Sequence, residues 1–426
     1  MTKTSKKLRL GFLALAAGLL LPGIVLADAE YDALQAQVRD LAAQLEAVQR
    51  TLAQIEQKQE EIPGTQETAI AALKQDIADA SEWRTPNALI HLAGYTDVGY
   101  INPENGDGSF AVGSFSPIFH FQYRDIVMLE SELEIELSPD GETELTLEYL
   151  AIDYFLNDYV TVVAGSFLSP IGQFRQNLHP SWINKLASAP PGFGHDGAAP
   201  TSDLGLQLRG AFPLGEMRSN YSVYVSNGPE LNAVFEDDEF ELEGIAAEAF
   251  GADADGEKVV GGRFAILPMA GLEIGVSAVT GKATVTGLED EDTGEVTEIE
   301  GAIARDYDVV GADFSWMWKN LNVRGEYVRS KVGEALTGTT ASEGATWKSW
   351  YTQAAWRIPA TKIEAVVRYT DFDSPHSSED QQQWALGLNY LITNSFIVKG
   401  TYELNDGIAG SRADNDRLML QLAYGF

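Results

Sequence analysis

From residue 88 onward, apolar and polar residues alternate along a series of short segments that turn residues separate. A period of two is typical of β-strands that place one face in an apolar environment and the other in water. The pattern predicts sixteen strands, at residues 88–101, 110–124, 126–138, 143–155, 159–167, 202–212, 217–227, 257–267, 272–282, 305–316, 320–332, 346–358, 361–372, 382–392, 395–405 and 415–426. An even number of strands is expected of a single-chain bacterial β-barrel.

The links between these segments alternate between short turns and longer connections, and three of the latter are long: 168–201, 228–256 and 283–304. Transmembrane barrels have short periplasmic turns and longer external loops, which gives this alternation. The predicted fold class is therefore an all-β membrane protein, a 16-stranded antiparallel transmembrane β-barrel.

Within a strand, the parity of a residue predicts whether it faces lipid or the lumen. Segment 126–138 has aliphatic residues at odd positions and glutamates at even ones. A charge on the lipid face costs about 2–4 kcal/mol at mid-membrane, so the charged positions are expected to face inward. The charged residues predicted to line the pore are Glu130, Glu132, Glu134, Glu136, Arg209, Arg263, Arg324, Arg357 and Arg368. Opposed acidic and basic rows would set a transverse field across the lumen, unless these charges pair with one another.

The region before the strands has a different, heptad period. Apolar residues recur there in alternate steps of three and four, and its predicted core is Leu34, Val38, Leu41, Leu45, Val48, Leu52 and Ile55. Leucine at a and β-branched residues at d favour assemblies of three or four helices, so we expect a coiled coil and a homotrimer. The alternative is one amphipathic helix that packs on its own domain.

The first residues are predicted to be a secretory signal peptide, because basic residues precede a short apolar run, Leu10–Leu21. An uncleaved anchor is the alternative. The predicted organisation is a signal peptide at 1–27, a periplasmic coiled coil at 28–64, a linker with a second helical segment at 65–86 and the barrel at 87–426. Tyr424 and Phe426, on the last amphipathic segment, resemble the signal that the outer-membrane barrel-assembly machinery reads.

The net charge of −34 argues against nucleic acid as a partner, because phosphates would be repelled. The chain has no cysteine, which excludes disulfides and thiolate metal sites. We find no serine-nucleophile, zinc or phosphate-loop motif, so the sequence predicts no enzyme, no cofactor and no metal site. The acidic runs 236–243 and 289–300 are interpreted as solvated loops, with divalent cations bridging them to lipopolysaccharide as a further option. Outer-membrane lipid and lipopolysaccharide are the expected surroundings.

The third external link, 168–201, is unusual in an acidic chain because its charges are mainly basic. Its cations include Arg175, His179 and Lys185. If the loop folds into the lumen, it forms a constriction whose cations favour anionic or zwitterionic solutes. The alternative is a loop that stays outside and packs on its neighbours.

The signal peptide, heptad region, strands, long third loop and terminal Phe together resemble the coiled-coil-prefixed trimeric outer-membrane porins. Gly165–Gly172 resembles the G-x-F-x-x-P-x-G pattern of the phosphate-selective porin O/P-like group. The resemblance implies a trimer and passive diffusion of small hydrophilic solutes through a water-filled lumen. It also implies phosphate selectivity from lumen cations, which Arg175, Lys185 and Arg209 could imitate. The inward glutamates do not fit an anion channel, so we predict a porin without assigning phosphate. The alternatives are an uptake channel specific for a siderophore, carbohydrate or phosphate, and a structural or adhesive barrel.

Overall fold

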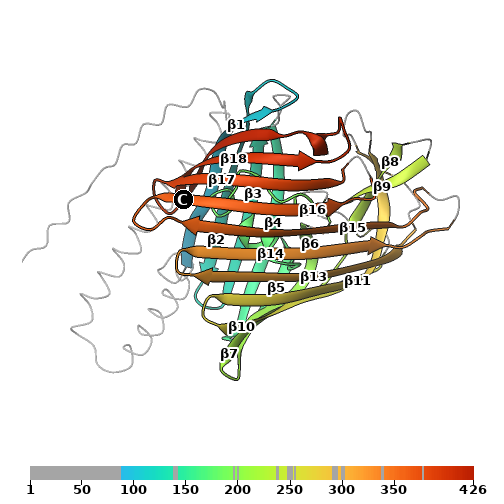
Figure 1. Ribbon diagram of the computed structural model, residues 1–426. Coiled ribbons are helices and arrows are strands. Elements are labelled where there is room, and N and C mark those ends of the chain that lie inside the picture. Colours follow the sequence, from blue (N-terminus) through green and yellow to red (C-terminus); the bar gives the residue numbers. More distant parts are fainter. Residues whose placement is uncertain are drawn as a thin grey trace, which may run out of the picture. The chain divides into compact units, whose positions relative to one another are not determined.

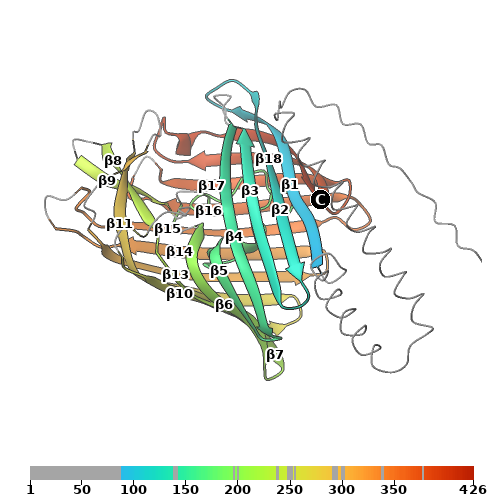
Figure 2. The same ribbon diagram turned by 180° about the vertical axis from the view of Figure 1, so that it is seen from behind.

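The computed structural model contains one closed β-barrel, and its C-terminal end lies at the end of the barrel opposite β8 and β9 (Figures 1 and 2). The structure describes residues 88–426 except 138–142, 195–196, 199–200, 237–238, 247–252, 254–255, 290–295, 299–302, 337–339 and 377–378. The predicted signal peptide, coiled coil and linker lie outside the described residues.

The barrel wall has sixteen strands, as the alternating pattern predicts, with bounds within a few residues of the expected ones apart from β11. They are β1 (Ala88–Pro103), β2 (Ser109–Tyr123), β3 (Val127–Leu137), β4 (Thr143–Asn157), β5 (Val160–Leu168), β6 (Ser202–Leu214), β7 (Met217–Ser226), β10 (Val259–Met269), β11 (Leu272–Glu289), β13 (Arg305–Trp318), β14 (Leu321–Val332), β15 (Ala345–Arg357), β16 (Ile363–Asp373), β17 (Gln381–Leu391), β18 (Phe396–Asp406) and β19 (Arg417–Gly425). Each strand pairs antiparallel with the next one around the wall.

The last strand closes the barrel against the first. β1 and β19 pair from Tyr95 opposite Gly425 to Pro103 opposite Arg417. Phe426 extends this seam through two backbone hydrogen bonds with Gly94. The Phe426 N–H donates to the Gly94 carbonyl (3.0 Å), and the Gly94 N–H donates to the Phe426 carbonyl (3.1 Å). A closed ladder leaves no unpaired strand edge, which a β-structure in a membrane requires.

Two of the links expected to be loops contain further strands. In the first, β8 (Glu230–Glu236) and β9 (Glu239–Ala246) form a hairpin. In the second, β11 continues to Glu289 and pairs antiparallel with β12 (Val296–Glu298). The extended part of β11 also pairs in parallel with β8. Leu242 of β9 is buried, as are its hairpin neighbours Leu231 and Ile245, so part of the predicted solvated acidic run 236–243 is a packed strand. His376, between β16 and β17, reaches this hairpin, with its Nε2 2.8 Å from the Leu242 carbonyl oxygen.

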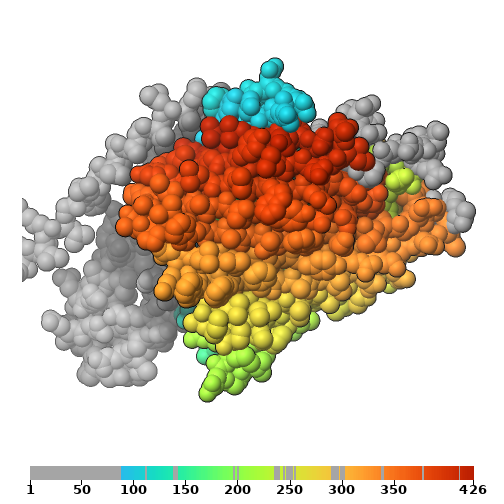
Figure 3. Space-filling model, in the orientation of Figure 1, coloured from blue at the N-terminus to red at the C-terminus, as the bar shows by residue number. Residues whose placement is uncertain are grey.

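The outer face of the wall is apolar, in the parity expected. On β17, Trp384, Leu386, Leu388 and Tyr390 are 48–60% exposed, whereas Gln383, Ala385 and Asn389 on the opposite face are buried. On the face seen in Figure 3, side chains cover the outside of the wall strands continuously. This division is the one that lipid outside and polar contacts inside would select. Among the described residues, no helix is long and apolar enough to cross a membrane.

Candidate functional site

The third loop lies inside the barrel and begins at a glycine that the wall requires. Gly172 has φ +71°, and a Cβ built there would overlap the carboxylate of Glu326 on β14. That carboxylate accepts the N–H groups of Gln173 (3.2 Å) and Phe174 (3.0 Å), while the Gly172 N–H donates to Ser277 Oγ on β11 (3.1 Å). The last glycine of the G-x-F-x-x-P-x-G motif therefore lets the chain turn against the inner wall.

The loop next reaches the opposite side of the barrel. A short π-helix, Phe174–Leu178, leads to His179, whose Nε2 lies 3.8 Å from Glu132 Oε1 on β3. The Tyr95 hydroxyl on β1 donates to the same carboxylate (2.7 Å), and its ring packs edge-on against His179. Of the glutamates predicted to line the pore, Glu132 is therefore buried beneath the loop.

Cations of the wall and the loop hold the next segment against β16–β19. Lys185 of the loop pairs with Glu364 on β16 at 3.2 Å, and its carbonyl accepts from Asn389 Nδ2 on β17 (2.8 Å). Lys399 on β18 is fully buried and donates to the carbonyls of Ser181 and Leu186, the latter at 3.1 Å. β17 and β18 thus bind the loop backbone directly, and β16 binds a loop side chain.

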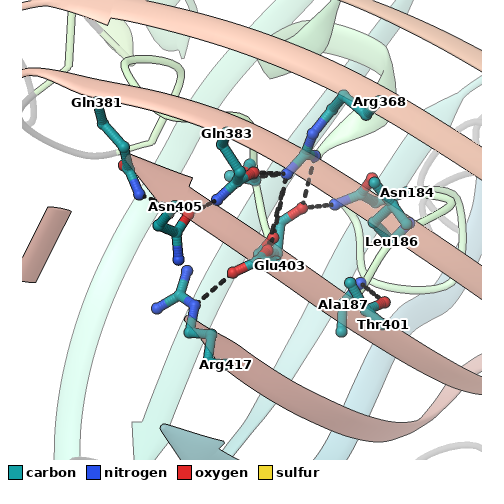
Figure 4. A network of polar contacts seen from close by, with 12 residues as sticks. Asn184, Leu186, Ala187, Arg368, Gln381, Gln383, Thr401, Glu403, Asn405 and Arg417 are labelled. Atoms are coloured by element: carbon teal, nitrogen blue, oxygen red, sulfur yellow. Dashed lines mark hydrogen bonds and ion pairs between the residues drawn. The ribbon is translucent and has the colours of Figure 1, made fainter. Parts of the chain in front are cut away.

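Arg368 is the centre of the densest of these networks (Figure 4). Its guanidinium donates to the carbonyls of Ser188 (3.0 Å) and Ala189 (3.1 Å) and to Gln383 Oε1 (2.8 Å), and it lies 3.9 Å from Glu403. Glu403 also accepts from Ser188 Oγ and from Arg417 Nε, so charges from β16 and β18 contact the loop residue Ser188, and β19 gives Glu403 a second basic partner. Arg368 and Glu403 are both almost fully buried.

The loop returns along β15 and β14 to β6. The carbonyl of Pro191 accepts from Ser349 Oγ (2.8 Å), and the carbonyl of Ala198 accepts from Ser330 Oγ. Phe193 packs against Tyr351 with ring centroids 5.1 Å apart. These contacts bury an apolar cluster between the loop and the wall. His195, the remaining loop cation in the sequence, lies outside the described residues.

Several of the arginines expected to line the pore lie on the inner face of the wall but are covered rather than open to the lumen. Arg263, Arg324 and Arg368 are 8%, 7% and 1% exposed. Arg263 is paired with Asp313 (2.6 Å) and Glu273 (2.9 Å), and Arg324 donates to Gln353 (3.0 Å) with that amide turned to accept. The expected opposed rows across open water are therefore replaced, on this side, by charges that pair within the wall.

Two predicted arginines lie elsewhere. Arg209 on β6 is one-third exposed and pairs with Asp153 and with Glu130 (3.3 Å), so it belongs to the acidic side of the barrel. Arg357 is exposed at the end of β15, beyond the part of the strand that the loop covers.

A cavity of about 300 Å³ remains between the loop and the side of the barrel formed by β1, β2, β3 and β19. Its charged lining consists of Asp97, Glu134 and Glu136 from the wall and Arg175 and His179 from the loop. This cavity lies on the β1–β3 side of the lumen, and its lining combines carboxylates of the wall with basic side chains of the loop.

The sequence and the barrel were compared with known proteins. Residues 270–426, from β11 to the end, match the family of phosphate-selective porins O and P. No curated protein matches the sequence. The anion-selective porin from Comamonas acidovorans is 15% identical, with a TM-score of 0.51 over 80% of this chain and 100% of that one. OmpF of Salmonella typhi in complex with daunomycin is 14% identical, with a TM-score of 0.50 over 80% of this chain and 98% of that one.

This barrel has the porin fold, and its second half matches a porin family. The structural likenesses, at these identities, show the fold, and the family match covers the second half of the barrel. The predicted passive-diffusion channel is confirmed, and the porin fold and match indicate a channel rather than an enzyme.

Some residues that shape the porin's lumen are missing from the sequence prediction. Asp97 lines the cavity and accepts from Ser114 Oγ (3.0 Å). It is a carboxylate in the middle of a membrane strand, so parity alone could have assigned it inward. Parity could also have placed Glu326 and Glu403 inward, but it gives no sign that they bind the loop, because an inward acid looks the same whether it meets water or protein.

Proposed function

We propose that this porin passes small hydrophilic solutes through a lumen narrowed by its third loop, residues 169–201. The observation that carries the proposal is the set of wall contacts that hold this loop inside the barrel, from Glu326 to Arg368 and Glu403. A sixteen-stranded barrel otherwise encloses a wide aqueous channel. A loop bound at many points narrows that channel, and the cavity beside β1–β3 is open space within it.

Within this proposal the predicted site residues take different roles. Arg175 and His179 are the constriction residues on the loop, whereas Lys185 is an anchor that binds Glu364. Glu134 and Glu136 line the passage, and Glu132 supports His179 from the wall. Arg263, Arg324 and Arg368 shape the pore indirectly, because they support the wall and the loop that covers them.

We also propose that three copies associate, with the heptad region 28–64 forming a periplasmic coiled coil. Its a/d pattern supports three or four strands. The surrounding partners would be outer-membrane lipid and lipopolysaccharide. Tyr424 and Phe426, each 43% exposed at the end of β19, are suited to recognition by the barrel-assembly machinery.

A substrate-specific uptake channel is the second candidate, and the small cavity favours it. A passage of about 300 Å³ lined by both signs of charge could hold one small solute in a preferred orientation. Flux that saturates with one solute at low concentration would support this candidate over general diffusion.

The proposal is tested with the full-length protein in planar bilayers and in liposomes. We expect stable conductance, in steps of three for a trimer, and swelling rates that fall with the size of uncharged sugars. A folded, heat-modifiable barrel that conducts no ions would overturn the channel. Equal flux for small and large sugars would overturn the narrowing by the loop.

A further inference from the structure

Two of the chain's five histidines form a pair at the end of the barrel where the chain terminates. His91 lies shortly before Gly94, which is hydrogen-bonded to Phe426, and it stands directly opposite His120 in the β1–β2 register. The two Nδ1 atoms are 3.3 Å apart and the ring centroids 5.6 Å apart, so the rings meet at these nitrogens rather than face to face. The pair is 29 positions apart in the chain, and only the register of the two strands brings it together.

The pair lies on the inner face of the wall and is accessible. His91 has the same parity on β1 as Tyr95, whose hydroxyl reaches Glu132 beneath the loop, so both side chains point inward. The pairing of β1 with β19 begins at Tyr95, so the segment that carries His91 extends beyond this seam. His91 is exposed, and the side chain of His120 is 27% exposed. An ion in solution at this mouth can therefore reach both rings.

The spacing of the two nitrogens suits a shared metal ion. Zn–N distances of about 2.0–2.1 Å and a tetrahedral angle place two imidazole nitrogens about 3.3–3.4 Å apart. The Nδ1 atoms now point at each other. Because the χ2 torsion of histidine is broad, a rotation of each ring directs both nitrogens toward one ion beside them without moving the strands.

Glu130 on β3 supports one of the two rings. It stands opposite His120 in the β2–β3 register, with its Oε2 4.0 Å from His120 Nε2. Its other oxygen, Oε1, pairs with Arg209 at 3.3 Å, so the carboxylate is held from two sides. A histidine that binds a metal through Nδ1 keeps its proton on Nε2, and a carboxylate facing that N–H fixes the ring and makes the ligand more basic.

We propose that His91 and His120 bind one divalent transition-metal ion, such as Zn²⁺, through their Nδ1 atoms, and that Glu130 positions His120. Imidazole suits Zn²⁺, Cu²⁺ and Ni²⁺, whereas Mg²⁺ and Ca²⁺ prefer oxygen ligands. Among the described residues, no group of three or more His, Asp or Glu side chains is arranged to hold a metal ion. The site therefore has two protein ligands, with water in the remaining positions. Without the ion, the two nitrogens share one hydrogen bond.

The test is calorimetric titration of the folded full-length protein in detergent with ZnCl₂. His91→Asn and His120→Asn should each weaken Zn²⁺ binding at least about 10-fold, and Glu130→Gln about 10-fold, because loss of an outer-shell partner alone costs about 10–100-fold. His376→Asn is the matched control, since this histidine lies at the β8–β9 hairpin, away from the pair, and it should leave the affinity unchanged. Equimolar MgCl₂ should not compete with Zn²⁺ for the site.

A second readout needs no variant. The Zn K-edge X-ray absorption spectrum of the protein with one equivalent of Zn²⁺ should show scattering from two imidazoles. A shell of oxygen ligands alone would overturn the proposal, because the ion would then be bound by carboxylates. Zn²⁺ affinity that survives in both folded, heat-modifiable histidine variants would also overturn it, and an effect of only one variant would overturn the shared site. Because binding is measured in detergent, none of these outcomes depends on whether the barrel conducts.

Discussion

The two sides of this barrel use charged residues for different purposes. Around β14–β18, inward charges are buried and bind the third loop, as Arg368 and Lys399 do. Around β1–β3, inward charges such as Asp97 and Glu136 border open space. The same strand parity brings both sets inward. What separates them is the position of one loop, so a wall residue's function depends on which side of the lumen the loop occupies.

The largest effect is expected from removing the guanidinium at the centre of the loop anchor. Arg368→Met leaves Glu403 buried with only Arg417 and Ser188 as partners, and it frees two loop carbonyls. Breaking a buried ion pair from one side costs about 3–5 kcal/mol, so we expect a comparable loss in the free energy of unfolding in urea. We also expect a larger and noisier single-channel current, because the loop is no longer held.

Arg357→Met is the matched control for this variant. It removes the same group from the same wall, but at an exposed position near the end of β15. Its unfolding free energy should change by less than about 1 kcal/mol. Equal effects of the two variants would mean that burial beneath the loop does not distinguish the arginines.

A smaller effect is expected at the point where the loop enters the lumen. Gly172→Ala introduces a Cβ that overlaps Glu326 and also strains a positive φ, whereas Gly215→Ala has a similar φ of +64° with nothing within 4 Å. Backbone strain alone costs about 1 kcal/mol, so the Gly215 variant should lose about that much and the Gly172 variant more. The difference between their thermal unfolding midpoints measures the close approach of the loop to the wall.

The smallest stability effect is expected on the acidic side. Glu134→Gln and Glu136→Gln alter side chains that border open space, and exposed ion pairs contribute about 0–1 kcal/mol. The urea midpoint should therefore stay within experimental error of the parent, although ion selectivity changes. A loss in the free energy of unfolding as large as that of Arg368→Met would mean that charged residues on the two sides of the barrel contribute equally to stability.

The sequence predicted the barrel because lipid and water impose a period of two on every strand. Val127 and Leu129 alternate with glutamates for that reason, and the strand bounds follow. The hairpin β8–β9 was missed because its glutamates indicate a solvated run, although Leu231 and Ala233 already alternated. A strand at the mouth needs no lipid face, so its pattern is weaker.

The position of the third loop could not be predicted from the sequence. It depends on contacts between residues far apart in the chain, such as Gln173 with Asp313 and Ser188 with Glu403. A basic loop could equally have met water or lipopolysaccharide. For the same reason, parity placed Arg324 and Arg368 inward but could not show that protein covers them.

The most direct test of this account is the reactivity of single cysteines, which the cysteine-free chain allows without background. Ser114→Cys places a thiol on the cavity lining, and Ser349→Cys places one on the inner face of β15 at 0% exposure, beneath Pro191 of the loop. Both are inward and both replace serine, so only the loop distinguishes them. With a cationic methanethiosulfonate reagent, Ser114→Cys should react quickly and reduce the current, and Ser349→Cys should react at least about 100-fold more slowly. Equal rates at the two positions would contradict a loop held inside the barrel against β14–β18.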